Sequence, residues 1–234
     1  MYMIVLGIIP ARGGSKSVPL KNIKSLRGTP LLAYAIRSAQ QASSLSRFVV
    51  STDHEDIARC AWEHGADVVD RPTAYATDTA STESALLHTL DVLEERDGFI
   101  PDIILTLEPT SPFRTAATID RCVALFEKTD ADSVIGVVET RSCYGRITDG
   151  RFSFLFPNQP RRRQEREPLY KEASIIYGTR TKTLREKQSV LGDCLYPLIV
   201  SEEEAFDINT PFDFMLAEAL MTQIRHDAYA TPSI

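Results

Sequence analysis

The residue types best suited to chemistry gather in one segment near the start of the chain. It reads Pro10-Ala11-Arg12-Gly13-Gly14-Ser15-Lys16, and Lys21-Asn22 comes shortly after. Adjacent glycines let backbone N–H groups turn towards one point, which makes a concave site for an anion. Arg12, Lys16 and Lys21 add charge that neutralises phosphate oxygens. In a chain of net charge −6 such a local density of cations is unusual. We therefore interpret the segment as a cradle for a triphosphate and not as a basic surface loop.

This segment matches neither of the two common phosphate-binding motifs. A P-loop requires G-x-x-x-x-G-K-[ST], whereas here Gly7 and Gly13 are separated by five residues and Ser15 follows Gly14. The dinucleotide fingerprint G-x-G-x-x-G is also missing from the sequence. The pattern therefore indicates a different kind of nucleotide site.

The segment from Pro10 to Asn22 resembles the signature of the CMP-sialic acid synthetases, a family of cytidylyltransferases that activate nine-carbon acidic sugars with CTP. Synthetases for the eight-carbon acid Kdo lack the Lys-Asn pair and fit less well. The resemblance implies that Mg²⁺ is the cofactor and that Arg12, Lys16 and Lys21 are catalytic. It also implies that the nucleotide contacts Ala11, Arg12, Gly13, Gly14, Ser15, Asn22, Arg71, Ser81 and Thr82. For Arg71, a surface salt bridge is an equally weighted alternative.

A second loop, from Glu108 to Arg114, resembles the family's Gln-Pro-Thr-Ser-Pro-Leu-Arg segment beside the acceptor sugar. The resemblance implies that the acceptor contacts Glu108, Thr110, Ser111 and Arg114. This chain has glutamate where the commonest form has glutamine. A carboxylate repels an acidic sugar unless it bonds a donor group or lies near a cation. The identity of the sugar is therefore open.

The densest positive cluster is Arg161-Arg162-Arg163-Gln164. A run of charges is usually a solvated face, and that alternative stays open here. Arg163 and Gln164, together with Tyr177, resemble the family's sugar-binding pattern, and arginine can clamp a carboxylate with two hydrogen bonds. Before Tyr177 the chain reads Ala173-Ser174-Ile175-Ile176, where the family usually has Asn-Gly before Ala-Ile-Tyr. An amide that would bond the sugar is thus absent.

Near the end of the chain, Asp207-Ile208-Asn209 resembles the family's Asp-x-Asp magnesium site. Residues two apart on an extended segment point to the same side, so oxygens of Asp207 and Asn209 can face one ion. The alternative is that Asp207 or Thr210 only caps the last helix.

The elements that must position these residues alternate between buried strands and helices. We expect strands at 4–9, 47–51, 67–69, 103–107, 133–138 and 196–200. We expect helices from 29–30 to 41, from a cap at Asp53 to 65, at 83–95, from 114 to 128 and at 211–224. This alternation predicts an α/β fold with a doubly wound, mostly parallel sheet, a nucleotidyltransferase-like variant of the Rossmann fold. Such sheets bind ligands at the carboxyl ends of their strands.

The chain is long enough for one core, so we expect a single domain over 1–234 with a β-rich insertion at 140–177. Phe152 to Phe156 alternates like an antiparallel strand, and Ser174 to Tyr177 resumes strand character. Exposed aromatic strands outside a core often pair with a second subunit. The resembling family uses a similar region to dimerise and to reach into the neighbouring active site, which implies a homodimer.

Composition narrows the class of protein further. The negative net charge argues against nucleic acid or an anionic membrane as partner. No apolar run approaches the length of a transmembrane helix, and the start lacks the basic region of a signal peptide. The four cysteines are scattered, which favours buried free thiols in a reducing cytoplasm over a zinc site.

Together these features predict a cytoplasmic, Mg²⁺-dependent cytidylyltransferase. The anomeric hydroxyl of an acidic nonulosonic sugar would attack the α-phosphorus of CTP, giving CMP-sugar and pyrophosphate. No histidine or cysteine is placed as a base, so metal or a carboxylate must assist deprotonation. One alternative is a different acid, such as legionaminic, pseudaminic or a Kdo-like sugar. Another, suggested by Glu108 and Asn209, is a nucleotide-binding protein without turnover.

Overall fold

A seven-stranded sheet forms the centre of the chain, in the order β11-β7-β10-β6-β1-β4-β5. The structure is a computed structural model, which describes residues 3–15 and 17–229, the side chains of 224–229 apart. The strands are β1 (Val5–Pro10), β4 (Arg47–Thr52), β5 (Asp67–Asp70), β6 (Ile103–Leu107), β7 (Ser133–Thr140), β10 (Leu169–Arg180) and β11 (Leu195–Val200). Only β10 runs antiparallel to its neighbours within this sheet. The mostly parallel sheet is confirmed.

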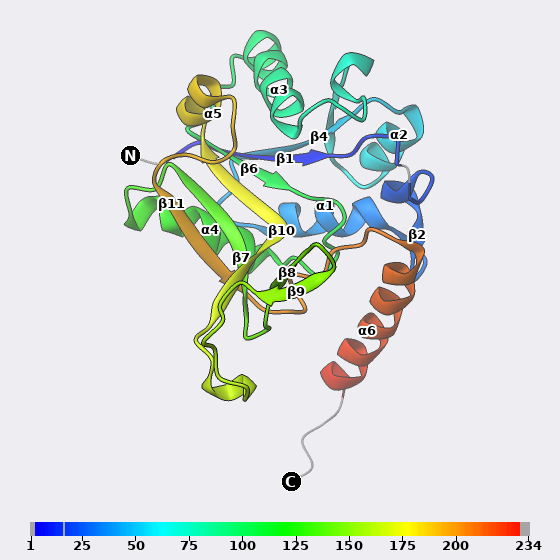
Figure 1. The fold of residues 1–234 in the computed structure, drawn as a ribbon. Coiled ribbons are helices and arrows are strands. Elements are labelled where there is room, and N and C mark those ends of the chain that lie inside the picture. Colours follow the sequence, from blue (N-terminus) through cyan, green and yellow to red (C-terminus); the bar gives the residue numbers. More distant parts are fainter. Residues whose placement is uncertain (1–2, 16, 230–234) are drawn as a thin grey trace.

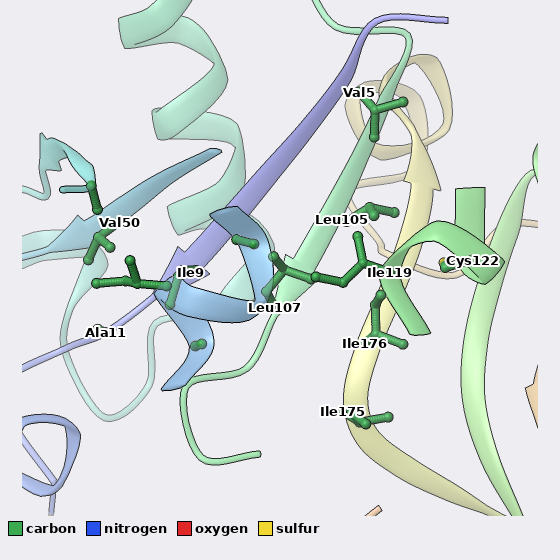
Figure 2. Packing of buried hydrophobic residues seen from close by; sticks show 14 of the residues in the cluster. Val5, Ile9, Ala11, Val50, Leu105, Leu107, Ile119, Cys122, Ile175 and Ile176 are labelled. Carbon is green, nitrogen blue, oxygen red and sulfur yellow. The ribbon is translucent and has the colours of Figure 1, made fainter. Parts of the chain in front are cut away.

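Helices cover both faces of the sheet (Figure 1). One face carries α1 (Leu31–Gln41), α2 (Glu55–Glu63) and α4 (Ala116–Lys128), and the other carries α3 (Thr82–Asp97) and α5 (Thr181–Lys187). Ile9 of β1 packs into the first core, whereas its neighbour Ile8 packs into the second, as the two-residue period of a strand requires. Figure 2 shows the first core, to which Ile9, Leu107 and Ile119 belong. The doubly wound arrangement is therefore confirmed.

Between β7 and β10 the chain leaves the sheet as an arm, residues 141–168, which projects away from the domain (Figure 1). The arm carries the hairpin of β8 (Gly145–Thr148) and β9 (Arg151–Phe154) and the short helix η3 (Arg163–Glu165). Residues 169–172 and 176–180 of β10 pair within the central sheet, so the projecting part is shorter than the expected insertion at 140–177.

The last helix, α6 (Pro211–Tyr229), ties the end of the chain to the opening loop. Phe214 and Ala217 of α6 share a small core with Ile208, Val18 and Leu26. This packing brings the segment before α6 against η1 (Lys21–Ile23) and the strand pair β2 (Ser25–Leu26) and β3 (Thr29–Pro30). Residues almost 190 positions apart in the chain therefore meet in one place.

The structure differs from the predicted elements at a few points. Thr29 and Pro30 pair with β2, so α1 begins at Leu31. The cap of α2 is His54, whose Nδ1 accepts from the Asp56 N–H at 3.2 Å, and not Asp53. The short helices η2 (Thr73–Tyr75) and α5 had no clear sequence signal.

All four cysteines are free thiols, and Cys60 and Cys122 are buried as expected. The expectation of burial is wrong for Cys143, which is exposed on the arm, and for Cys194, which is half-buried before β11.

Candidate active site

The opening loop leaves the carboxyl end of β1 and is held at several points. The Ala11 N–H donates to the Ser51 carbonyl at 2.9 Å, and the Gly13 N–H donates to Asp53 Oδ1 at 2.9 Å. A Cβ on Gly13 would lie 2.6 Å from the His54 ring, so glycine is required for this close approach. Asn22 is buried, and its amide donates to the Arg12 carbonyl at 3.0 Å. These contacts fix the backbone that the sequence predicted as a phosphate cradle.

Beside this loop lies a cavity of about 450 Å³, called here the nucleotide cavity. The predicted nucleotide residues that line it are Arg12, Ser15, Asn22, Arg71, Ser81 and Thr82. Ala11 is buried, and neither it nor Gly13 or Gly14 lines this cavity. Lys16 lies outside the described residues. Six of the nine residues predicted for the nucleotide thus meet around one cavity.

Two arginines of this cavity are held in different ways. Arg12 donates from Nη1 to the Thr77 carbonyl at 3.0 Å and lies 3.2 Å from an Asp78 oxygen. Arg71 is buried and bonds Ser51, with Nε 3.1 Å from Oγ and Nη2 2.7 Å from the carbonyl. Burial lowers the pKa of Arg71. Its position excludes the alternative of a surface salt bridge.

A second cavity of about 480 Å³, called here the acceptor cavity, adjoins the first. Four residues line both cavities: Lys21, Thr82, Glu108 and Thr110. Lys21 Nζ donates to the Ile208 carbonyl at 2.9 Å and to Asn209 Oδ1 at 3.3 Å. Burial lowers its pKa, although Asp207 and Glu108 oppose this effect. The shared wall is where groups bound in the two cavities can react.

Glu108 is the carboxyl group of this shared wall. Burial, with a further contribution from the charge of Asp207, raises its pKa to about 7. The cations Arg114, Lys21 and Arg71 limit the rise. Near neutral pH the group is therefore protonated part of the time, which reduces its repulsion of an acidic ligand.

Arg114 and Ser111 lie behind the wall and do not line either cavity. Arg114 is buried and donates from Nη1 to the carbonyls of Glu108 at 2.8 Å and Ile175 at 2.9 Å. Burial lowers its pKa to about 10. Ser111 Oγ lies 3.5 Å from the Ser174 carbonyl. Both residues were predicted to contact the acceptor, but in the structure they join the 108–114 loop to β10.

The remaining acceptor residues are split between two places. Thr110 and Tyr177 line the acceptor cavity. Arg163 and Gln164 lie in η3, exposed on the arm, and line neither cavity. Within one chain the structure therefore does not bring the arginine cluster to the site.

Asp207 fits the role of a cation ligand better than that of a helix cap. Its Oδ1 is buried and has no hydrogen-bond partner among the described residues, while Oδ2 accepts from Asn209 Nδ2 at 2.6 Å. The start of α6 is capped instead by Thr210, whose Oγ1 accepts from the Asp213 N–H at 3.2 Å. The described residues contain no cluster of three or more acidic, histidine or cysteine ligands. One carboxylate completed by substrate phosphates is an arrangement that Mg²⁺ accepts.

Sequence reasoning missed residues that hold or line the site. Asp53 anchors the loop, Thr77 and Asp78 bind Arg12, and Glu172 lines the acceptor cavity. The position of Asp53 directly after β4 was an available signal, because ligand sites form at that edge of the sheet. Glu172 had no such signal, because its orientation depends on an irregularity in β10.

Comparison with known proteins identifies the family of this chain. The model of the cytidylyltransferase family matches residues 6–219. A CMP-N,N'-diacetyllegionaminic acid synthase of Legionella pneumophila is 35% identical, over 94% of this chain and 97% of its own length. An N-acylneuraminate cytidylyltransferase of Escherichia coli is 30% identical, over 91% of this chain but 51% of its own length.

Among solved structures, a CMP:2-keto-3-deoxy-manno-octonic acid synthetase complexed with CTP superposes with a TM-score of 0.71. It is 17% identical, and the match covers 94% of this chain and 99% of the synthetase, so it supports the fold. No described helix has the length and apolar character needed to cross a membrane.

Proposed function

The chain belongs to the cytidylyltransferase family and is a nucleotidyltransferase, and on this basis we propose that it transfers the cytidylyl group of CTP to a nonulosonic acid. The observation that carries the proposal is the pair of adjoining cavities whose shared wall contains Lys21, Glu108 and Thr110. A transfer reaction needs two substrates to meet at one point, and a protein that only binds a nucleotide does not need the second cavity.

In this reaction CTP occupies the nucleotide cavity, with its triphosphate against the opening loop. The acceptor's anomeric oxygen attacks the α-phosphorus at the shared wall, the bond to the β-phosphate oxygen breaks, and pyrophosphate leaves. Arg12 and Lys21 neutralise the charge that develops on the phosphate oxygens. The hydroxyl proton passes to Glu108, the carboxyl group of the shared wall.

Asp207 would hold Mg²⁺ through its buried Oδ1, which no described residue bonds, together with substrate oxygens. When bound, the ion would neutralise phosphate charge. The Asn209 amide keeps Asp207 in place from one side and accepts a bond from Lys21 on the other. Hydrogen bonds thus link the ammonium group of Lys21, the amide of Asn209 and the carboxylate of Asp207.

As the first acceptor we propose a diacetamido nonulosonic acid of the legionaminic type, with N-acetylneuraminic acid second. Three features support this order. The legionaminic relative matches along almost its whole length, whereas about half of the E. coli N-acylneuraminate enzyme is matched. Glu108 replaces the commonest glutamine, and Ala173-Ser174 replaces Asn-Gly.

The arm suggests how the acceptor's carboxylate is bound. Because Arg163 and Gln164 are remote from their own chain's cavities, we propose a homodimer in which they reach the neighbouring acceptor cavity. Arginine from the partner would supply the bidentate clamp that the acidic cavity lacks.

The test is release of pyrophosphate from CTP, ATP, GTP or UTP with a panel of sugar acids. We expect turnover with CTP in strong preference to the others, and with N,N'-diacetyllegionaminic acid ahead of N-acetylneuraminic acid and Kdo. Equal use of all four triphosphates contradicts the cytidine assignment. Tight CTP binding without turnover of any acid would show a binding protein.

A further inference from the structure

The acceptor cavity has a charge pattern unlike that expected for an acidic sugar. Its described lining includes the carboxyl groups of Glu83, Glu108, Glu172 and Asp207, against the single cation Lys21. A sugar carboxylate placed against β10 would meet repulsion. The β10 side of the acceptor cavity is better matched to a neutral part of the acceptor that carries hydrogen-bond donors.

Glu172 reaches the cavity because β10 is irregular. Glu172 pairs with Val137 of β7, and Tyr177 pairs with Ile135. The two paired residues are five positions apart in β10 but only two positions apart in β7. In a regular strand, residues five apart point to opposite faces. The surplus residues form a bulge, and both Glu172 and Tyr177 line the acceptor cavity.

Neighbouring residues hold this bulge in place. A Cβ on Gly136 of β7 would lie 2.7 Å from Ile175 Cγ2 and 3.1 Å from the Ala173 carbonyl, so the bulge occupies the space of a missing side chain. Arg114 donates to the Ile175 carbonyl from behind the wall at 2.9 Å. The bulge is therefore a fixed part of the site, and bulges of this kind commonly aim a side chain at a ligand.

Tyr177 orients the carboxylate of Glu172. Its hydroxyl donates to Glu172 Oε1 at 2.5 Å. Burial, and then the bond to Glu172, raise the pKa of Tyr177 to about 12, so the hydroxyl keeps its proton near neutral pH. Tyr177 thus engages one oxygen of Glu172, and the other oxygen can accept from a ligand.

We propose that Glu172 is a specificity-determining residue, whose carboxylate accepts a hydrogen bond from the second acetamido N–H of a diacetamido acceptor. The inference rests on the proposed cytidylyl transfer. An amide N–H only donates and an ionised carboxylate only accepts, so the two are complementary. N-acetylneuraminic acid has only one acetamido group and cannot make this bond. The acidic lining of the acceptor cavity repels the carboxylate of either sugar, so that this carboxylate points away from β10.

The test compares N,N'-diacetyllegionaminic acid with N-acetylneuraminic acid on the full-length wild type and on Glu172→Leu, Glu172→Gln and Tyr177→Phe. We expect Glu172→Leu to lower kcat/KM for the diacetylated acid about tenfold or more and to reduce its preference over the other acid. The KM for CTP should change less than about twofold. Glu172→Gln should fall between, because its amide oxygen still accepts, and Tyr177→Phe should show a smaller loss than Glu172→Leu.

Glu127→Leu, which removes an exposed carboxylate on α4, is the matched control and should behave as wild type. An equal loss for both acids, or an unchanged preference, overturns the assignment of Glu172. Calorimetric binding of both acids to each variant separates the two proposals. If wild type binds an acid but releases no pyrophosphate, the transferase proposal fails while the binding preference still tests Glu172. If it binds neither acid, both fail.

Discussion

Lys21 is the described cation that borders both cavities, and its ammonium group is held by main-chain and side-chain oxygens of the segment before α6. We expect Lys21→Ala to lose about 100-fold or more in kcat, because it deletes a donor aimed at phosphate charge. Arg12→Ala should lose a similar factor. Circular dichroism should show an intact fold for both, with a small loss of Tm for Lys21→Ala from its missing bond to Ile208.

Lys24→Ala provides the control for these variants. Lys24 is exposed at the end of the same short helix, and its Nζ lies 4.9 Å from the centre of the Phe214 ring. Its kinetics should be those of wild type. Near-normal turnover in both Lys21→Ala and Arg12→Ala would contradict the hypothesis that the loop binds the triphosphate. Unfolding of either variant would show that the loop serves to stabilise the fold.

Glu108 makes stability depend on pH in a direction set by its pKa. In the folded chain its pKa rises from 4.5 to about 7, so the folded state binds the proton more tightly than the unfolded state. Stability from this group is therefore present below pH 4.5 and is lost as pH rises through about 7. Glu108→Gln stays neutral, so its Tm should exceed that of wild type by several °C at pH 8 and match it near pH 4.

These melts are run in EDTA, so that no cation bound near Asp207 alters the comparison. Glu127→Gln, an exposed carboxylate on α4, should show no pH-dependent difference. A Tm difference that is the same at both pH values would mean that Glu108 titrates normally.

Asp207 and Asn209 can be separated by metal dependence. Asp207→Ala should be almost inactive at any Mg²⁺ concentration. Asn209→Asp replaces the amide that donates to Asp207 Oδ2 by a second carboxylate, which repels Asp207 until a cation binds. We expect the Tm of Asn209→Asp to be lower than that of wild type in EDTA and to rise more steeply as Mg²⁺ is added. We also expect this variant to reach its half-maximal rate at a lower Mg²⁺ concentration than wild type.

Two outcomes contradict this assignment. Full activity of Asp207→Ala at limiting Mg²⁺ would place the ion elsewhere. An unchanged Tm and an unchanged Mg²⁺ requirement in Asn209→Asp would show that a carboxylate at that position does not take part in binding the ion.

Among the strands and loops, the features predictable from the sequence are those that short-range patterns determine. The apolar run into Pro10 and the run at 103–107 are strands of the central sheet because both of their faces are buried, and such runs are recognisable without a structure. The loop after β1 was recognised from its glycines and cations, and its residues Arg12, Ser15, Lys21 and Asn22 do line one cavity.

The features that the sequence did not predict depend on contacts between distant residues. Asp53 was assigned to cap α2, but it bonds Gly13 instead, because the loop comes to it from another strand. Arg114 was assigned to the acceptor, but burial turns it towards carbonyls of its own loop and β10. The bulge in β10 has no pattern of its own, since it is defined by its register with β7.

Gly136 tests whether that bulge is built into the fold. Gly136→Ala places a methyl group against Ile175 and the Ala173 carbonyl, which should cost about 1–3 kcal/mol of unfolding free energy. The same shift should raise the acceptor KM while CTP affinity changes little. Chemical denaturation of Gly14→Ala is the control, because a Cβ there meets nothing within 4 Å. Equal stability of the two variants would show that the bulge yields without strain.

In the molecule taken as a unit, the arm is the part that a single chain leaves incomplete. Ile147, Phe152 and Phe154 are exposed on its hairpin, and Arg163 lies farther along it, away from both cavities of its own chain. Exposed apolar side chains on a projecting hairpin favour an interface with a second copy. We therefore expect a dimer in light scattering, and Phe152→Glu should shift it towards monomer.

If Arg163 acts across the dimer, two impaired variants should restore each other when the acceptor concentration is low. Arg163→Ala alone should raise the acceptor KM with little effect on CTP. When it is mixed with Lys21→Ala and subunits exchange, each mixed dimer contains one complete site, made by the Lys21 of one chain and the Arg163 of the other. Random exchange puts half the dimers in this state, so roughly a quarter of wild-type activity should return.

The matched control mixes Lys21→Ala with Asp207→Ala. Lys21 and Asp207 line the same cavity of one chain, so neither site of that mixed dimer is complete and no activity should return. Recovery in the first mixture but not in the second requires that Arg163 serve the neighbouring chain. No recovery in either mixture, from a protein shown to exchange subunits, means that Arg163 serves its own chain or none. If Arg163→Ala alone has normal acceptor kinetics, the arginine cluster at 161–163 is only a solvated face of the arm.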